Sequence, residues 1–354
     1  MSDIREPKYE QATPLPDEPY YQVPTTTAPR RGGRTLAGGI LLALGVVWLL
    51  GVLLGGEGRE GPVGGGNILF EQTYEATRLE MDVSTGNIEI RPWDESNIKI
   101  EAIYQGGDAS DYAVKVDPRD GTVYVTGGPK PGFLSLGQRD IEYRISLPAT
   151  ADVQIKTANG EIDVAELRGL VDLTSTNGDI TASAIARGLQ AETVNGRIEL
   201  DEIGGALDLH STNGEISLSD GRVSSGTVQS VNGDIDLRGV SGKLNVESTN
   251  GDIQIGDATD AALRASTSNG DIEFEGSLAP NDTSTISTIS GDVVVRLPED
   301  SSFTLDATTI SGEIDSDFEL QDGQESRRER SGTVGNGGPR LEIETTSGDI
   351  SVIH

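Results

Sequence analysis

The sequence contains no cysteine, only two histidines and few aromatic residues, which account for 4% of its 354 positions. Without cysteine there can be no disulfide bond and no thiolate metal site. A Ser/His/Asp catalytic set could form only around His210 or His354, and we expect both to be exposed to solvent. Aromatic platforms for sugars are nearly absent. We therefore predict no catalytic residue and no cofactor.

Basic residues are also scarce, with 27 lysines and arginines beside 58 aspartates and glutamates and a formal net charge of −31. In residues 1–35 the five basic and five acidic side chains cancel, so the excess negative charge lies in the rest of the chain. Because this charge repels phosphate, we expect no nucleic-acid partner.

Long apolar runs are absent except for residues 36–56, which contain no charged side chain. As a helix these residues would be about 31 Å long, enough to cross the hydrocarbon core of a bilayer. Arg30, Arg31 and Arg34 precede the run, and a basic flank of this kind favours the cytoplasmic side. The sequence thus predicts a single-pass plasma-membrane protein with a cytoplasmic N-terminus. A cleaved signal peptide is the alternative, but the 35 residues before the run and its length argue against it.

The remaining segments differ in composition. The proline-rich residues 1–35 are predicted to be a disordered cytoplasmic tail, and the glycine-rich residues 57–66 a linker. In residues 67–150 apolar and polar side chains alternate as in strands, but without a regular repeat. We predict that they form a β cap and the first coils, because the exposed end of a repeat stack needs an atypical cap. The polar residues 321–340 are expected to be a loop that leaves the repeats, before a last coil at 341–353.

Residues 151–354 are dominated by a repeat whose centre reads Asn-Gly, an acidic residue and Ile. Seven asparagines head the repeats at intervals of 18, 18, 18, 19, 18 and 19 residues: Asn159, Asn177, Asn195, Asn213, Asn232, Asn250 and Asn269. Weaker copies begin at Ser290, Ser311 and Ser347. A fixed period of this kind indicates a repeat architecture.

Aligned on these residues, the repeats show columns of like side chains. The positions six and four before, and three and five after, are mostly apolar, whereas the position two before is always Ser or Thr. In each half of the repeat, apolar and polar positions alternate with a period of two, which indicates a strand with one inward face. We expect Asn-Gly to separate the two strands because both residues tolerate positive φ.

Two folds compete for this pattern. Asn-Gly between alternating runs is a hairpin signal and favours an antiparallel meander, but hairpins give no reason for identical columns. In a β-solenoid each repeat is one coil, and like residues stack at about 4.8 Å. The Ser/Thr column suits the corner of such a coil. We predict an all-β protein, a parallel β-solenoid of about 18–21-residue coils, with Leu200, Leu218 and Leu237 in one inward column; the meander is the alternative.

The position two after each Asn or Ser gives an outward row of acidic residues, which Arg197 interrupts. Carboxylates bind Ca²⁺, so this row contains the candidate calcium ligands: Asp179, Asp234, Asp252, Asp271 and Asp292. The spacing is not that of the nine-residue calcium roll, and each ion would find few carboxylates. The favoured interpretation is a solvated acidic edge that limits aggregation.

Four features resemble a known family: Leu79–Ile90 followed by Arg91-Pro92-Trp93, the strand Ile141–Pro148, the Asn-Gly repeats, and the ending from Gly335 to Ile350. The family is the "putative adhesin" β-strand-repeat domains of bacteria and archaea, a domain of unknown function. The resemblance covers about residues 67–354. It implies surface attachment, and relatives also occur in envelope-stress signalling systems. It supplies no catalytic residue.

The resulting hypothesis is a membrane-anchored, extracytoplasmic and adhesin-like module of the surface or envelope, without enzymatic activity. Its partners would be the lipid bilayer, through residues 36–56, and an unknown cell-surface or envelope ligand. The alternative is an envelope-stress or ligand sensor that signals through its cytoplasmic tail. A glycan-active β-helix enzyme is a remote alternative, because the short coils and tight turns leave no room for a groove built from long loops.

Overall fold

The computed structural model describes residues 67–105, 112–130 and 141–354. The predicted tail, membrane span at 36–56 and linker lie outside these residues. Every regular element in the described part is a β-strand. None of the described residues forms a helix long and apolar enough to span a membrane.

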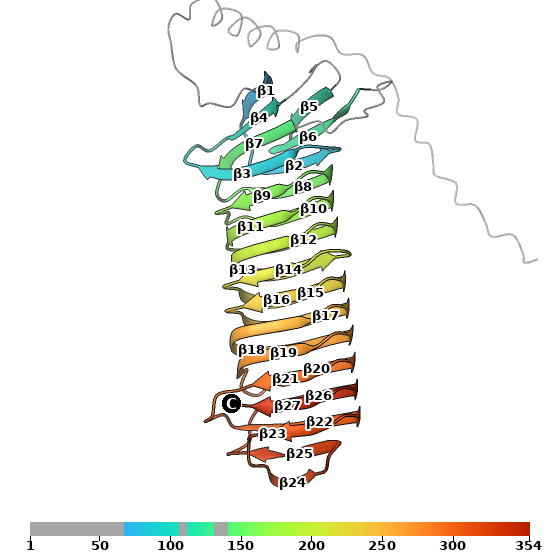
Figure 1. Cartoon of the computed structure of the whole chain (residues 1–354). Coiled ribbons are helices and arrows are strands. Elements are labelled where there is room, and N and C mark those ends of the chain that lie inside the picture. The colour runs from blue at the N-terminus through green and yellow to red at the C-terminus, as the bar shows by residue number, and fades with distance from the viewer. Residues whose placement is uncertain (1–66, 106–111, 131–140) are drawn as a thin grey trace, which may run out of the picture. The chain divides into compact units, whose positions relative to one another are not determined.

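The strands join into one continuous hydrogen-bonded sheet that winds into coils (Figure 1). The strands that precede the turns form what we call the pre-turn wall: β2 (Arg78–Val83), β8 (Asp152–Asn159), β10 (Val171–Asn177), β12 (Gly188–Asn195), the second half of β13 (Ile198–Ser211), β15 (Arg222–Asn232), β17 (Ser241–Asn250), the second half of β18 (Ile253–Asn269), β20 (Thr283–Ser290), β22 (Phe303–Ser311) and β26 (Arg340–Ser347). The strands that follow the turns form the post-turn wall: β3 (Asn87–Trp93), β9 (Ile162–Ala165), β11 (Ile180–Ile185), the first halves of β13 and β18, β14 (Ile216–Ser219), β16 (Ile235–Arg238), β19 (Ile272–Leu278), β21 (Val293–Arg296), β23 (Ile314–Ser316) and β27 (Ile350–Ile353).

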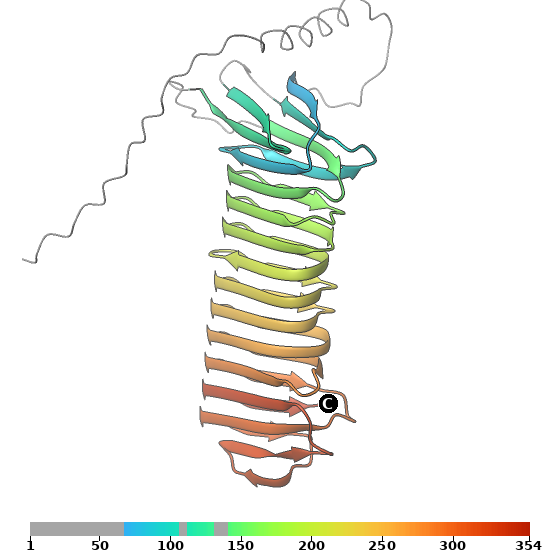
Figure 2. The same cartoon turned by 180° about the vertical axis from the view of Figure 1, so that it is seen from behind.

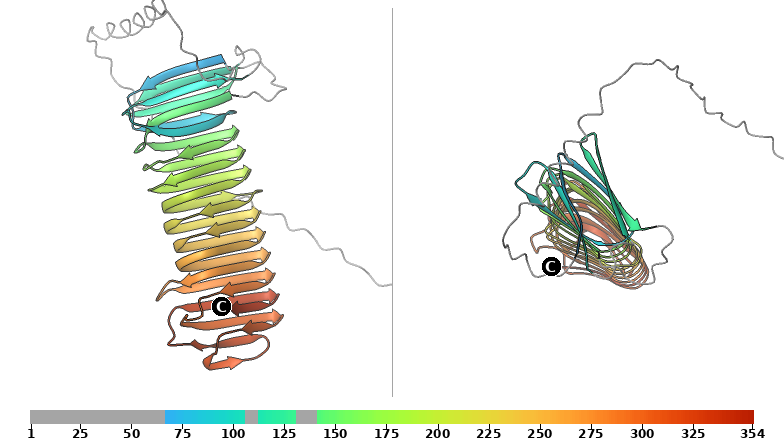
Figure 3. Two further views of the ribbon diagram at one scale, coloured as in Figure 1. Left: turned by 60° about the vertical axis from the view of Figure 1, so that its left-hand side comes forward. Right: turned by 90° about the horizontal axis from the view of Figure 1, so that it is seen from above.

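Successive coils pair in parallel and in the register that the repeats predict. Leu218 on β14 pairs with Leu200 on β13 and with Leu237 on β16. On the pre-turn wall, β10 pairs in parallel with both β8 and β12. The parallel stack is thus confirmed, and the antiparallel meander is wrong for the repeats. Seen along the stack, the coils lie over one another (Figure 3).

The core is a set of stacked aliphatic columns between the two walls. Inward residues such as Ile216, Leu218 and Ile235 are at most 1% exposed. All ten Ser or Thr residues two positions before the turns are also buried. Their hydroxyls lie against the corner, where Thr193 donates to the Gly178 carbonyl over 3.2 Å. The predicted use of this column to fill a corner is therefore confirmed.

The N-terminal end is closed by strands inserted between β3 and β8. The inserted strands are β4 (Ile98–Tyr104), β5 (Tyr112–Arg119), β6 (Thr122–Pro129) and β7 (Ile141–Pro148). Together with β1 (Asn67–Tyr74), which precedes β2, they form the cap. β2 and β3 pair directly with β8 and β9, so they form a coil of the stack. On the other side of this coil, β6 pairs in parallel with β2, and β7 pairs in parallel with β3. The outer cap strands are antiparallel: β5 pairs with β6, β4 with β7, and β1 with β4.

At the C-terminal end the coils do not stack in the order in which they occur in the sequence. β26 pairs with both β20 and β22, and β27 pairs with both β21 and β23 (Figures 1 and 2). The last coil of the chain therefore lies between two earlier ones. The segment 321–340, expected to be a loop, instead contains β24 (Gln321–Glu325) and β25 (Glu329–Val334). These strands form a hairpin, and β25 closes the end by pairing antiparallel with β22.

Candidate functional site: the turn edge and the pre-turn face

The turn edge is the line of Asn-Gly or Ser-Gly turns between the two walls. None of its seven asparagines, all in the described part, has a positive φ, whereas Gly160 and Gly270 do, at 154° and 157°. The expected reason for Asn-Gly is therefore wrong for the asparagines and for most of these glycines. All the glycines are required by close stacking. A Cβ on Gly178 would lie 2.0 Å from the Gly160 carbonyl oxygen, and one on Gly251 would lie 2.3 Å from that of Gly233. Only glycine lets successive turns approach this closely.

The asparagine side chains form a hydrogen-bonded ladder along this edge. Each amide nitrogen donates to the side-chain oxygen of the asparagine one coil earlier, over 2.9–3.0 Å, from Asn177 through Asn269. Asparagine suits this role because its amide carries both a donor and an acceptor. The ladder is a structural use of the side chains that the repeat pattern alone did not reveal.

The acidic row beside the ladder is also hydrogen-bonded to the backbone. Asp179 Oδ1 accepts the main-chain N–H of Arg197 over 2.7 Å, and Asp252 Oδ1 accepts that of Asp271 over 2.8 Å. Asp234, Asp271 and Asp292 do the same for the next coil. Each candidate calcium ligand therefore has one oxygen engaged in holding two coils together. In the described part of the chain no group of three or more His, Asp or Glu side chains is placed to hold a metal ion.

The pre-turn face is the outer surface of the pre-turn wall. It carries an exposed column one residue before the turns, in which Val194, Val231, Ile289 and Ile310 are 37%, 44%, 55% and 69% exposed. A shallow hollow of about 580 Å³ runs along this face beside the column and is lined mainly by Ser, Thr, Gln and Glu side chains. The face thus combines apolar β-branched side chains with hydrogen-bonding groups over several coils.

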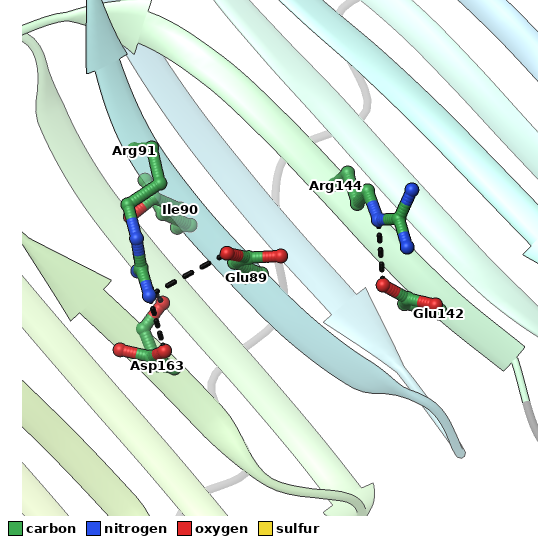
Figure 4. A network of polar contacts seen from close by, with 6 residues as sticks. All are labelled: Glu89, Ile90, Arg91, Glu142, Arg144 and Asp163. Carbon is green, nitrogen blue, oxygen red and sulfur yellow. Dashed lines mark hydrogen bonds and ion pairs between the residues drawn. The ribbon is translucent and has the colours of Figure 1, made fainter. Parts of the chain in front are cut away.

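A second hollow, of about 760 Å³, lies where the cap meets the first coils and is lined by Glu89, Glu142, Glu161 and Asp163. Figure 4 shows Arg91 reaching from β3 to Asp163 on β9, with Glu89 at 3.5 Å. The hydrogen bond to Asp163 raises the pKa of Arg91. This network neutralises part of the acidic lining and fastens the cap coil to the next coil.

The two histidines do not form a catalytic arrangement within the described residues. His210 Nε2 lies 2.9 Å from Asp208, and His354 Nδ1 lies 3.9 Å from Asp317, with both imidazoles exposed to solvent. Neither pair includes a serine nucleophile. Ser211, next to His210, is buried on the opposite face of its strand.

A protein family is known whose sequence model matches the repeats described above. The Toastrack DUF4097 family model matches residues 76–279 and 262–353, and the chain belongs to this family. None of the curated proteins matches the chain.

Several solved structures are similar in part. A "putative adhesin" from Parabacteroides merdae is 12% identical with a TM-score of 0.37, and the match covers 82% of this chain and 98% of the other. A "putative adhesin" from Bacteroides fragilis is 12% identical with a TM-score of 0.32, covering 80% and 96%. A "putative lipid binding protein" from Parabacteroides distasonis is 11% identical with a TM-score of 0.37, covering 82% and 98%. At these values, function has to be argued from the chain's own residues.

Proposed function

We propose that the chain is a membrane-anchored, extracytoplasmic and adhesin-like interaction module without enzymatic activity. The observation that carries the proposal is the exposed β-branched column of the pre-turn face, with Val194, Val231, Ile289 and Ile310. Along the column these apolar side chains alternate with polar ones such as Thr212, Thr249 and Ser268. Exposed apolar surface bordered by polar residues is typical of sites that bind another macromolecule. These side chains are stiff at χ1, so little conformational entropy would be lost on binding.

The chemistry of the turn edge favours a role without catalysis. Asp179, Asp234 and Asp252 each hold the backbone of the next coil, and the asparagines hold one another. Groups engaged in this way stabilise the stack and are not poised for proton transfer or nucleophilic attack.

The flanking charge limits the kind of partner. The acidic row runs alongside the exposed column, and the chain carries a net charge of −31. A polyanion would be repelled, so we expect a neutral or basic envelope or cell-surface partner. The apolar run at 36–56 and its basic flank would anchor the protein with this face outside the cell.

Binding of the detergent-solubilised full-length chain to isolated cell envelopes tests the proposal. The double variant Val231→Lys/Ile289→Lys should bind several-fold more weakly, because it places charge in the exposed column. Thr181→Lys/Gln254→Lys is the matched control, since it adds the same charge at exposed positions of the post-turn wall. Equal loss of binding in both variants, or in neither, would contradict a role for the pre-turn face.

A further inference from the structure

The Asn-Gly turns share one chemistry but are not held in the same way. In most turns the main-chain N–H of the glycine donates to the carbonyl of the Asn or Ser that heads the adjacent coil. The glycines that make this bond, over 2.9–3.2 Å, are Gly86, Gly160, Gly178, Gly251, Gly270, Gly291 and Gly348. Within the described stack, three consecutive glycines lack it, Gly196, Gly214 and Gly233, as does Gly312, which follows Ser311 in the repeat coil next to the C-terminal hairpin.

A second kind of hydrogen bond is missing at two of the same turns. Ser248 Oγ donates to the Gly233 carbonyl, but the buried hydroxyls of Ser211 and Ser230, which would serve Gly196 and Gly214, have no partner. Strand β13 also ends at Ser211, whereas its neighbours β12 and β15 continue to the turn asparagine. Thr157, at the N-terminal end of the same column, also has a hydroxyl without a partner. Missing hydrogen bonds of both kinds nevertheless occur together at Gly196 and Gly214, in the middle of the stack.

This difference bears on a reaction to which Asn-Gly is prone. The main-chain nitrogen of glycine loses its proton to solvent and attacks the side-chain carbonyl carbon of the preceding asparagine. A C–N bond forms and the bond to the side-chain amide nitrogen breaks. That nitrogen takes up a proton from solvent and departs as ammonia, and a five-membered succinimide remains. Water then opens the ring at either carbonyl and gives aspartate or isoaspartate. Asparagine is thermolabile for this reason, and glycine has no side chain to hinder the attack.

We propose that Asn195, Asn213 and Asn232 are modification sites at which the folded protein converts asparagine to aspartate or isoaspartate. All three side chains are exposed to water, which is the only co-reactant. The glycine nitrogen that follows each of them donates no hydrogen bond, so no bond to a neighbouring coil has to break before it loses its proton. At Asn159, Asn177, Asn250 and Asn269 the same nitrogen is held by a carbonyl of the adjacent coil.

The modification would change the ladder at its centre. Asn213 Nδ2 now donates to Asn195 Oδ1, and Asn232 Nδ2 donates to Asn213 Oδ1, each over 3.0 Å. A carboxylate has no proton to donate, so conversion of Asn213 or Asn232 removes one of these bonds. It also adds negative charge beside the row that contains Asp234, where like charges repel. Isoaspartate would in addition lengthen the backbone and disturb the stacking of the turn.

Peptide mass mapping of the full-length chain in detergent, after incubation at 37 °C and mildly basic pH, tests the proposal. Asn195, Asn213 and Asn232 should be converted several-fold faster than the other four asparagines of the ladder. In denaturant, where no turn is held, all seven should react at similar rates. Equal rates in the folded protein, or faster conversion at the four held sites, would overturn the proposal. So would a folded protein in which none of the seven reacts.

A matched pair of variants gives a second measurement. Serine heads three of the natural repeats, so Asn→Ser changes at 195, 213 and 232 should be compatible with the stack. This triple variant should lose the slow acidic shift on isoelectric focusing. The corresponding changes at 159, 177 and 250 should leave the shift in place. The opposite pattern would overturn the assignment of the reactive sites.

Discussion

Leu218 pairs with Leu200 across one coil boundary and with Leu237 across the next, always through the same face of the strand. Three like side chains thus form a column in which Leu218 lies between the leucines of the coils before and after it. Stacked repeats of this kind derive their stability from intrinsic terms and nearest-neighbour interfaces. The relation also distinguishes the solenoid from a hairpin, in which residues would pair across each turn.

Leu218→Asp should destabilise the stack severely. The side chain is 1% exposed, so the change would bury an unpaired carboxylate and leave a gap in the column. The expected loss is several kcal/mol, comparable with the total of about 5–15 kcal/mol for a domain. Denaturant unfolding of the full-length chain would measure it. Ser219→Asp is the control, because Ser219 is exposed, and it should leave the free energy of unfolding nearly unchanged. An equally small effect of Leu218→Asp would contradict the inward column.

Gly251→Ala should also be destabilising, although it adds only one methyl group. The new Cβ would lie 2.3 Å from the Gly233 carbonyl oxygen, so two coils would have to move apart. Overpacking of this kind costs about 1–3 kcal/mol. Gly256→Ala is the control, because there the nearest atom is the flexible Arg238 Cγ at 4.0 Å. Similar melting temperatures for the two variants would show that the turn glycines are not needed for close stacking.

Two serines of the corner column should respond differently to removal of the hydroxyl. Ser248→Ala breaks the bond to the Gly233 carbonyl and should cost about 1 kcal/mol. Ser230→Ala removes a buried hydroxyl without a partner and should be neutral or stabilising. Chemical denaturation of both variants would measure the difference. The reverse order would mean that the corner bonds contribute nothing to stability.

The cap should lose stability at high pH. Burial raises the pKa of Tyr143, whose hydroxyl lies 3.1 Å from that of Tyr112, and burial also raises the pKa of Tyr112. A tyrosine has a pKa of about 10 when unfolded. Above that pH the unfolded chain loses protons that the folded cap retains, so the free energy of unfolding falls; below it this contribution is fully present. Tyr143→Phe should reduce the slope of stability against pH above 10, and an unchanged slope would assign the loss to other groups.

Protease treatment of intact cells tests the predicted membrane topology. The protease should remove residues 57–354 and leave the tail 1–35 intact, because three arginines precede the apolar run. In permeabilised cells the tail should be cut as well, which serves as the control. Protection of the repeats in intact cells would reverse the orientation and contradict an external adhesin-like role.

The sequence was sufficient to predict the parallel stack, because identical columns have meaning only when coil lies on coil. The Ser/Thr corner followed from the same alignment. The reason for the turn glycines could not be found there, since the approach of Gly251 to Gly233 exists only between coils. The exposed column could have been read from the repeats, where Val194, Val231 and Ile289 hold an outward position. The pairing of β26 with β20 and β22 left no signal, because a repeat pattern does not specify stacking order.

The position of the last coil has a consequence for how the protein is made. β26 and β27 hold the coils on either side of them together, yet they follow both of those coils in the sequence. Until they are synthesised, the coil of β22 and β23 has no partner on that side. The distal end can therefore be completed only when β26 and β27 enter between two coils that were made before them. A truncated translation product would lack this closing coil and would carry two unpaired strand edges, a state that protein quality control could recognise.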